Sequence, residues 1–164
     1  MIATIVAVDN NWGIGRNGDL LANIPEDKKF FKDKTDGSVV VMGRKTWDSL
    51  PIKPLPNRKN YVISRNTIDN RGKDAEYISI EKAIETIENT HEQNIFIIGG
   101  GQIYSKLLPY CDTIYVTKIY ESYEADTFFP NIDSMNEWEI IDSSEIKTYN
   151  NISYQFITYK KRRR

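Results

Sequence analysis

One carboxylate stands in a setting that favours acid–base chemistry. Asp27 follows Pro25 by two residues, and proline suits the first position of a helix because its missing N–H costs nothing there. Asp27 then lies in the first turn, on the same helix face as Phe31 four residues later. Phe31 marks that face as inward, where a carboxylate is costly unless it has a partner. Asp27 is therefore a candidate ligand-binding acid, although a first-turn acid can also simply favour the helix dipole.

Few other groups in the chain offer catalytic chemistry. His91 is the only histidine and lies in a polar stretch, which excludes histidine-based triads and multi-histidine metal sites. Cys111 is the only cysteine, so no internal disulfide is possible and a reducing compartment, the cytoplasm, is expected. No cluster of cysteine, histidine and carboxylate has ligand spacing, and we expect no metal.

Two glycine-containing junctions, at 41–46 and 97–102, each connect an expected strand to an expected helix. Glycine there lets a ligand approach the backbone, and the helix start offers free N–H groups to an anion. Neither junction is a P-loop, and Tyr104 takes the place of the last glycine of a dinucleotide fingerprint. Each junction alone is equally consistent with an ordinary turn, but the pair favours a ligand with several phosphates along one sheet edge.

Cations near these junctions support the same interpretation. Arg44 and Lys45 belong to the first junction, while Ser64 and Arg65 end another expected strand. A ligand with a separate phosphate, such as a 2′-phosphorylated dinucleotide, would use them.

Hydrophobic patterning places these residues on an α/β framework. Strands are expected at 2–8, 38–42, 60–64, 76–78, 95–98, 113–119, 138–142 and 153–159, and helices at 25–34, 43–50, 80–88 and 102–108. The segment 9–19 is expected to be a loop, and its length favours a functional one. The alternation predicts one α/β domain over residues 1–164, with a central mostly parallel sheet, helices on both faces and an antiparallel C-terminal edge hairpin.

The composition is that of an ordinary globular protein. The 164 residues are 40% hydrophobic and 27% charged, with a formal net charge of −1. This balance gives no electrostatic reason to expect nucleic acid or a membrane as a partner. The basic end at 160–164 is the exception, and a solvated tail is the simpler interpretation.

Taken together, these segments resemble the bacterial dihydrofolate reductases, over essentially the whole chain. The order and spacing of the matching segments are more specific than any one of them. The segments are 5–7, 12–15, 24–27, 30–32, 41–47, 55–58, 98–104 and 126–130.

The resemblance implies reduction of 7,8-dihydrofolate to tetrahydrofolate with NADPH, which supplies one-carbon metabolism. It implies that Asp27 contacts the 2-amino group and N3 of the pterin, with Thr117 as its hydroxyl partner, and assists protonation at N5. Burial would raise the pKa of Asp27 and the helix N-terminus would lower it, and the sequence leaves this open. Arg58 would pair with the α-carboxylate of the substrate's glutamate. The other implied substrate contacts are Ile5, Ala7, Phe31, Leu50, Ile98 and Tyr104.

The implied cofactor residues lie at the end of the strand 2–8, in the lid loop 9–24, at the two junctions, at the start of the helix 102–108 and at the end of the strand 60–64. They are Ala7, Ile14, Gly15, Gly43, Arg44, Lys45, Thr46, Ser64, Arg65, Gly99, Gly100, Gly101, Gln102, Ile103 and Tyr104. A cis peptide between Gly99 and Gly100 is also implied, and such bonds occur mainly at functional sites.

The chain departs from the family pattern in the lid. Leu21 and Ala22 replace a usual proline and tryptophan, and Lys28 stands where an apolar pocket residue is common. Trimethoprim-type antifolates pair with the same acid but carry no carboxylate for Arg58. We therefore expect weak inhibition by trimethoprim with retained reductase activity.

Three alternative functions fit parts of the pattern. A pyrimidine reductase of riboflavin synthesis shares the architecture but has no need of Asp27 or Arg58. A non-catalytic nucleotide-binding module would have no use for the lid, and a nucleic-acid-binding protein would depend on the tail at 160–164. We expect the protein to be a monomer that binds dihydrofolate and antifolates.

Overall fold

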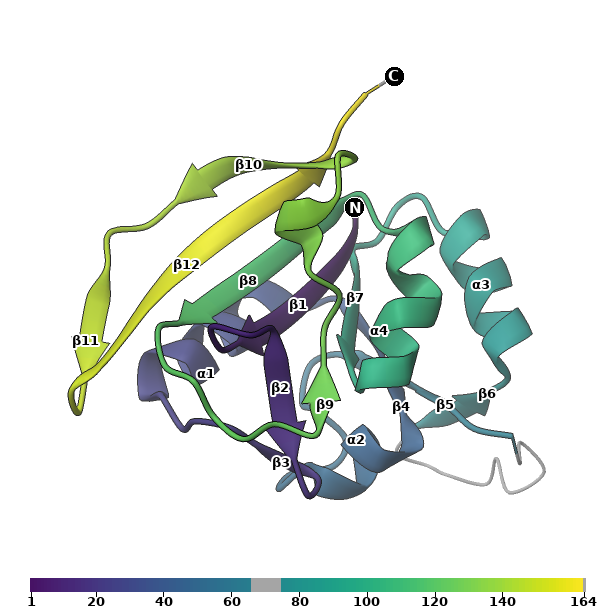
Figure 1. Cartoon of the computed structure of the whole chain (residues 1–164). Helices are drawn as coiled ribbons and strands as arrows, with labels where there is room; N and C mark the ends of the chain where they lie inside the picture. Colours follow the sequence, from purple (N-terminus) through teal and green to yellow (C-terminus); the bar gives the residue numbers. More distant parts are fainter. Residues whose placement is uncertain (66–74, 164) are drawn as a thin grey trace.

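The computed structural model describes residues 1–65 and 75–163 (Figure 1). Its main sheet has nine strands, in the order β10-β12-β8-β1-β7-β4-β5-β6, with β11 paired to β12. These strands are β1 (Ile2–Val8), β4 (Val39–Gly43), β5 (Lys59–Ile63), β6 (Glu76–Ile78), β7 (Ile95–Gly99), β8 (Thr113–Ile119), β10 (Trp138–Ser143), β11 (Lys147–Tyr149) and β12 (Ile152–Lys161).

The pairing within the main sheet is parallel from β8 through β1, β7, β4 and β5 to β6. β12 pairs antiparallel with β8, β10 and β11. The predicted mostly parallel sheet with an antiparallel C-terminal edge is therefore confirmed. Among the described residues, no helix has the length and apolar character needed to cross a membrane.

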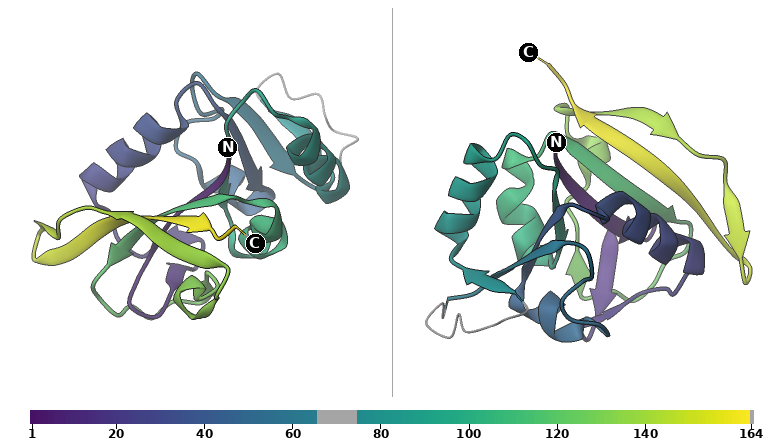
Figure 2. Two further views of the ribbon diagram at one scale, coloured as in Figure 1. Left: turned by 90° about the horizontal axis from the view of Figure 1, so that it is seen from above. Right: turned by 180° about the vertical axis from the view of Figure 1, so that it is seen from behind.

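Helices cover both faces of this sheet, as Figure 2 shows from two further directions. They are α1 (Pro25–Thr35), α2 (Arg44–Ser49), α3 (Ile80–Asn89) and α4 (Gly101–Leu107), with 3₁₀ turns η1 (Leu108–Tyr110) and η2 (Ile132–Ser134). Successive residues of a strand face opposite sides, so β1 contributes to two cores. Val6 packs in a cluster with Leu107 of α4, whereas Ile5 packs in another with Phe31 of α1.

The prediction that residues 9–19 form a loop is partly wrong. The segment contains β2 (Gly13–Arg16) and β3 (Asp19–Leu20), and β2 also pairs with β9 (Thr127–Phe128) in a separate three-stranded sheet. Strands of two to four residues, rich in glycine and polar side chains, carry no hydrophobic pattern to predict them. β11 was missed for the same reason.

Helix boundaries agree with the sequence patterns to within about two residues, the usual scatter of such assignments. Ser79 caps α3 by accepting a hydrogen bond from the Lys82 backbone N–H at 3.1 Å. α1 begins at Pro25, but its N-cap, Ile24, provides no side-chain hydrogen bond. The start of α1 is therefore held by contacts from elsewhere in the fold.

Candidate active site

The two glycine junctions meet at the carboxyl edge of the sheet, because β4 and β7 are parallel neighbours. A Cβ atom on Gly43 would lie 3.0 Å from the Ile103 side chain and 3.8 Å from the Gly100 nitrogen. Gly99 has a φ of +136°, and a Cβ there would lie 3.0 Å from the Thr46 hydroxyl oxygen. The peptide between Gly99 and Gly100 is cis, as the resemblance implied. Close contacts at both positions and the positive φ of Gly99 favour glycine, so bare backbone faces the space between α2 and α4.

The lid strands β2 and β9 approach Gly101, the next glycine of the second junction. A Cβ on Gly101 would lie 2.7 Å from the Thr127 side chain and 4.0 Å from Ile14. Gly15 is hydrogen-bonded to the β9 side of the lid through its carbonyl, which accepts from the Asp126 N–H at 2.9 Å. The lid and the second junction thus form adjoining walls of one site.

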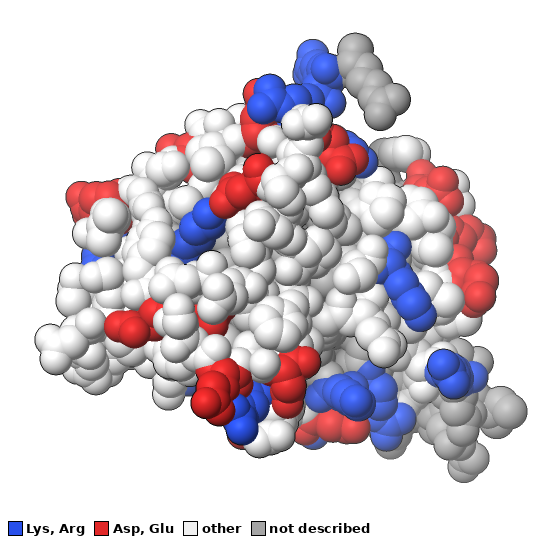
Figure 3. Space-filling view, viewed as in Figure 1, with Lys and Arg blue, Asp and Glu red and all other residues white. Residues whose placement is uncertain are grey.

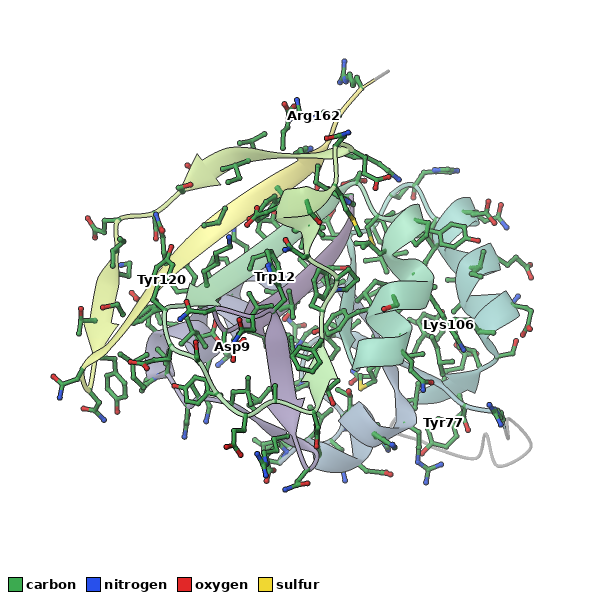
Figure 4. The ribbon with its side chains drawn as sticks, in the orientation of Figure 1. Asp9, Trp12, Tyr77, Lys106, Tyr120 and Arg162 are labelled. Carbon is green, nitrogen blue, oxygen red and sulfur yellow. The ribbon has the colours of Figure 1, made fainter. Side chains whose placement is uncertain are left out.

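A buried carboxylate anchors the base of the lid. Asp9, labelled in Figure 4, accepts backbone N–H groups from Asn11, Gly13 and Tyr123 at 2.8–2.9 Å. These hydrogen bonds join the segment after β1 to the segment after β8. The sequence showed Asp9 only as a polar loop residue, because its partners depend on a contact across 114 positions.

The basic side chains that the sequence analysis assigned to phosphate binding lie around the first junction. The Arg44 guanidinium lies 5.5 Å from the centre of the Tyr77 ring and bonds Asp48 at 3.2 Å through Nε. Lys45 and Arg65 are exposed, and the Ser64 N–H donates to the carbonyl of Ile78 beside Tyr77. Figure 3 shows Lys and Arg side chains gathered over α2, while Asp and Glu line the outer face of α3. Sequence analysis missed Tyr77, which only the β5–β6 pairing brings to Arg44.

These residues fit a dinucleotide with a separate phosphate. The glycine backbone offers close approach, and the Arg44 fork with its aromatic partner offers bidentate recognition of phosphate. Gln102 is exposed at the start of α4, next to the glycines. Among the described residues, no group of three or more His, Cys, Asp or Glu side chains is placed to hold a metal ion.

Asp27 lies at the other end of the site, on the sheet face covered by α1. Thr117 of β8 donates its hydroxyl hydrogen bond to Asp27 Oδ1 at 2.6 Å. Burial raises the pKa of Asp27, and the bond from Thr117 offsets part of that rise. This resolves the question that the sequence left open in favour of burial.

Tyr104 closes the interior side of the site. Its hydroxyl donates to the carbonyl oxygen of Ile5 at 2.9 Å. Burial, with a smaller contribution from the negative charge of Asp27, raises its pKa far above the usual range. Tyr104 therefore remains a neutral donor, and it connects α4 to β1.

The implied apolar walls come together on the α1 side of the sheet. One hydrophobic cluster contains Ile5, Phe31, Leu50 and Ile98, and of these four Ile5 is buried while the others are partly exposed. Ala7 packs instead in the neighbouring cluster around Ile24. The partly exposed members leave apolar surface next to Asp27.

Arg58 is held at the far end of α1. Its Nη1 donates to the Thr35 hydroxyl oxygen at 3.0 Å and its Nε to the Pro56 carbonyl at 2.8 Å. Thr35 in turn donates to the carbonyl oxygen of Phe31 at 2.8 Å. These contacts fix the guanidinium beside the apolar walls, one helix length from Asp27.

Comparison with known proteins decides the family. Residues 1–161 match the model of the dihydrofolate reductase family. The dihydrofolate reductase of Bacillus subtilis is 38% identical, with 99% of this chain and 95% of that protein covered. The enzyme of Neisseria gonorrhoeae is 39% identical, with 96% of each chain covered.

This chain belongs to the dihydrofolate reductase family. The structure of a dihydrofolate reductase from Enterococcus faecalis, complexed with NADP(H) and RAB-propyl, has 33% sequence identity and a TM-score of 0.86. It covers 98% of this chain and 96% of its own. The chain is thus an NADPH-dependent oxidoreductase that reduces dihydrofolate, and neither a riboflavin-pathway pyrimidine reductase nor a non-catalytic module.

Proposed function

We propose that Asp27 is the acid of this reductase, and that it both holds the pterin and assists protonation at N5. The observation that carries this proposal is the partly buried Asp27–Thr117 pair beside the apolar walls. NADPH, when bound, supplies the hydride that reduces C6 of the pterin. The test is NADPH oxidation with dihydrofolate, compared between the parent protein and an Asp27→Asn variant.

Each side chain at the Asp27 end of the site has its own proposed role. The Asp27 carboxylate accepts from the 2-amino group and N3 of the pterin, and Thr117 fixes its orientation. Ile5, Phe31, Leu50 and Ile98 exclude water from the ring. Burial raises the pKa of Asp27, which moves its carboxyl group toward the range in which it can exchange protons at neutral pH.

The nucleotide end is assigned in the same way. Gly43, Gly99, Gly100 and Gly101 present backbone to the cofactor, with Thr46, Gln102, Ile103 and Tyr104 around them. Ala7, Ile14 and Gly15 contact its nicotinamide half, and Arg44, Lys45, Ser64 and Arg65 surround its 2′-phosphate. Tyr77 joins this group through its contact with Arg44.

Arg58 is proposed to bind the α-carboxylate of the substrate's glutamate. Arg58→Lys keeps the charge but loses the planar fork, so one charge-assisted hydrogen bond is removed. We expect KM for dihydrofolate to rise about tenfold, the value of one such bond, with kcat and the affinity for NADPH unchanged. Steady-state kinetics checks this, and an equal loss for a folate fragment without the glutamate would contradict it.

Weak inhibition by trimethoprim remains a proposal, and we now attribute it to the residue at position 22. Lys28 is exposed, whereas Ala22 is partly buried against Ile24 and Tyr154. Ala22→Trp restores an apolar surface at the lid end, and we expect trimethoprim to bind about tenfold more tightly, the value of burying roughly two methylene groups. Turnover should be retained.

Leu20→Trp is the control for position 22, because Leu20 is 72% exposed in the same lid. Inhibition constants for trimethoprim are measured for the parent and both variants. Nanomolar inhibition of the parent, or no change in Ala22→Trp, would contradict the role of position 22.

Three further predictions stay open. They are that residues 1–164 form a single domain, that the protein is a monomer, and that it lies in the cytoplasm.

A further inference from the structure

Glu26, the neighbour of Asp27, is held by two side chains from the C-terminal hairpin. The Tyr154 hydroxyl of β12 donates to Glu26 Oε1 at 2.7 Å. The Lys147 ammonium of β11 donates to Glu26 Oε2 at 3.2 Å. These contacts cross more than 120 positions and reach a helix start that lacks a side-chain N-cap.

The strand register brings this contact beside the Asp27–Thr117 bond. In the pairing of β12 with β8, Tyr154 lies opposite Ile119, and Phe156 lies opposite Thr117. Two adjacent strands therefore each send one hydroxyl to consecutive residues of α1. Tyr154 bonds Glu26 while Thr117 bonds Asp27.

The Tyr154 hydroxyl is fixed by its ring. Tyr154 is 4% exposed and packs in one cluster with Ile24 and Ile119. Its ring meets Phe156 edge-on at 5.8 Å, and Phe156 stacks on Phe30 of α1 at 4.4 Å. Because these rings join β12 to α1, the hydroxyl cannot shift without moving the helix.

The charges keep this contact formed at neutral pH. The bond from Tyr154 is the main cause that lowers the pKa of Glu26, with Lys147 adding to it. Burial and the Glu26 carboxylate raise the pKa of Tyr154 to about 12. Glu26 thus remains an ionised acceptor and Tyr154 a neutral donor.

We propose that Tyr154 and Glu26 form a clamp that positions Asp27 against Thr117. The clamp acts through the first turn of α1, so Tyr154 and Glu26 are positioning residues and do not touch the substrate. This proposal rests on the proposed role of Asp27 as the acid. It extends that role to a residue of the C-terminal hairpin that the reaction itself does not involve.

The Tyr154→Phe variant keeps the ring and removes the hydroxyl. We expect kcat/KM for dihydrofolate to fall about three- to tenfold, the usual value of one hydrogen bond.

The pH profile gives a second readout of the same variant. The groups that face Asp27 are Thr117 of β8, Tyr104 of α4, Tyr154 of β12 and Glu26 of its own helix. The bond from Thr117 lowers the pKa of Asp27, so loosening it should move the midpoint of the pH profile upward.

Tyr159→Phe is the matched control. Tyr159 also lies on β12, is 1% exposed and donates to a carboxylate, Asp133 Oδ1, at 2.7 Å. It packs in the cluster on the opposite face of the sheet and makes no hydrogen bond to α1. We expect loss of the Tyr159 hydroxyl to lower the melting temperature and to leave the midpoint of the pH profile unchanged.

Two Glu26 variants test whether the clamp acts as one unit. Glu26→Ala should reproduce the effect of Tyr154→Phe, and the double variant should be no worse than either single one. Glu26→Gln retains an oxygen acceptor for Tyr154 and should recover part of the rate. None of these variants should change the affinity for NADPH.

Two results would overturn the clamp. One is an unchanged pH midpoint in both Tyr154→Phe and Glu26→Ala. The other is an equal shift in Tyr159→Phe, which would make the effect one of general stability. Failure of the Asp27 proposal is recognised separately, because Asp27→Asn would then turn over normally at pH 7 whatever the clamp variants do.

Discussion

Replacing Asp27 by asparagine is expected to lower the rate of dihydrofolate reduction at pH 7 by about 10²–10⁴-fold, the usual contribution of a positioned acid–base group. Asparagine keeps the shape and can still accept the hydrogen bond from Thr117. It cannot take up or release a proton, and no histidine is present at the site to replace it. The loss should therefore appear in the chemical step.

The pH dependence of the loss gives a second readout. The deficit of Asp27→Asn should become smaller at low pH, where the substrate itself takes up a proton. Asp33→Asn is the control, because Asp33 is an exposed carboxylate on the same helix and pairs with Lys29. Near-normal turnover of Asp27→Asn at pH 7 would remove Asp27 from the mechanism.

The same substitution should stabilise the fold. Burial raises the pKa of Asp27 above its ordinary value of 3.8, so the folded state disfavours the ionised form. Stability linked to this group is fully present below the unfolded pKa and is lost as the pH rises through the folded pKa. At pH 7, Asp27→Asn should therefore melt at a higher temperature than the parent, and the difference should diminish in acid.

The centre of the main sheet was predictable because strands such as β4 are buried on both faces. Runs such as 39–42 are continuous β-branched and apolar, which indicates a central parallel strand. The lid strands β2 and β3 were not predictable, because β2 pairs with β9, more than a hundred positions away, and β3 pairs with β2. The C-terminal hairpin was expected as an edge, but its third strand, β11, is only three residues long.

The sequence could predict those parts of the site that lie at the ends of strands. Gly43 and Gly99 follow neighbouring parallel strands, so their convergence follows from the topology. Contacts set by register were not predictable. The bond of Tyr154 to Glu26 requires the pairing of β12 with β8, and the contact of Tyr77 with Arg44 requires the pairing of β6 with β5. The burial that raises the pKa of Asp27 likewise depends on tertiary packing.

Loss of Arg44 is expected to weaken NADPH binding without weakening NADH binding. The Arg44 guanidinium is held by the Asp48 carboxylate and the Tyr77 ring, and it is proposed to bind the 2′-phosphate that NADH lacks. A hydrogen bond to a charged group contributes about 1.5–3 kcal/mol, so Arg44→Gln should weaken NADPH about ten- to a hundredfold. Dissociation constants for both dinucleotides, measured by calorimetry in the absence of substrate, check this.

The control for Arg44 is Lys82→Gln, which removes an exposed cation from an ion pair on α3. It changes the net charge by the same amount, so it reports any general electrostatic effect on an anionic ligand. Raising the salt concentration should reduce the preference for NADPH more in the parent protein than in Arg44→Gln, because the parent has one more cation next to the 2′-phosphate to screen. Equal losses of NADPH and NADH in Arg44→Gln would instead mean that Arg44 supports the shape of the site through Tyr77 and does not distinguish the phosphate.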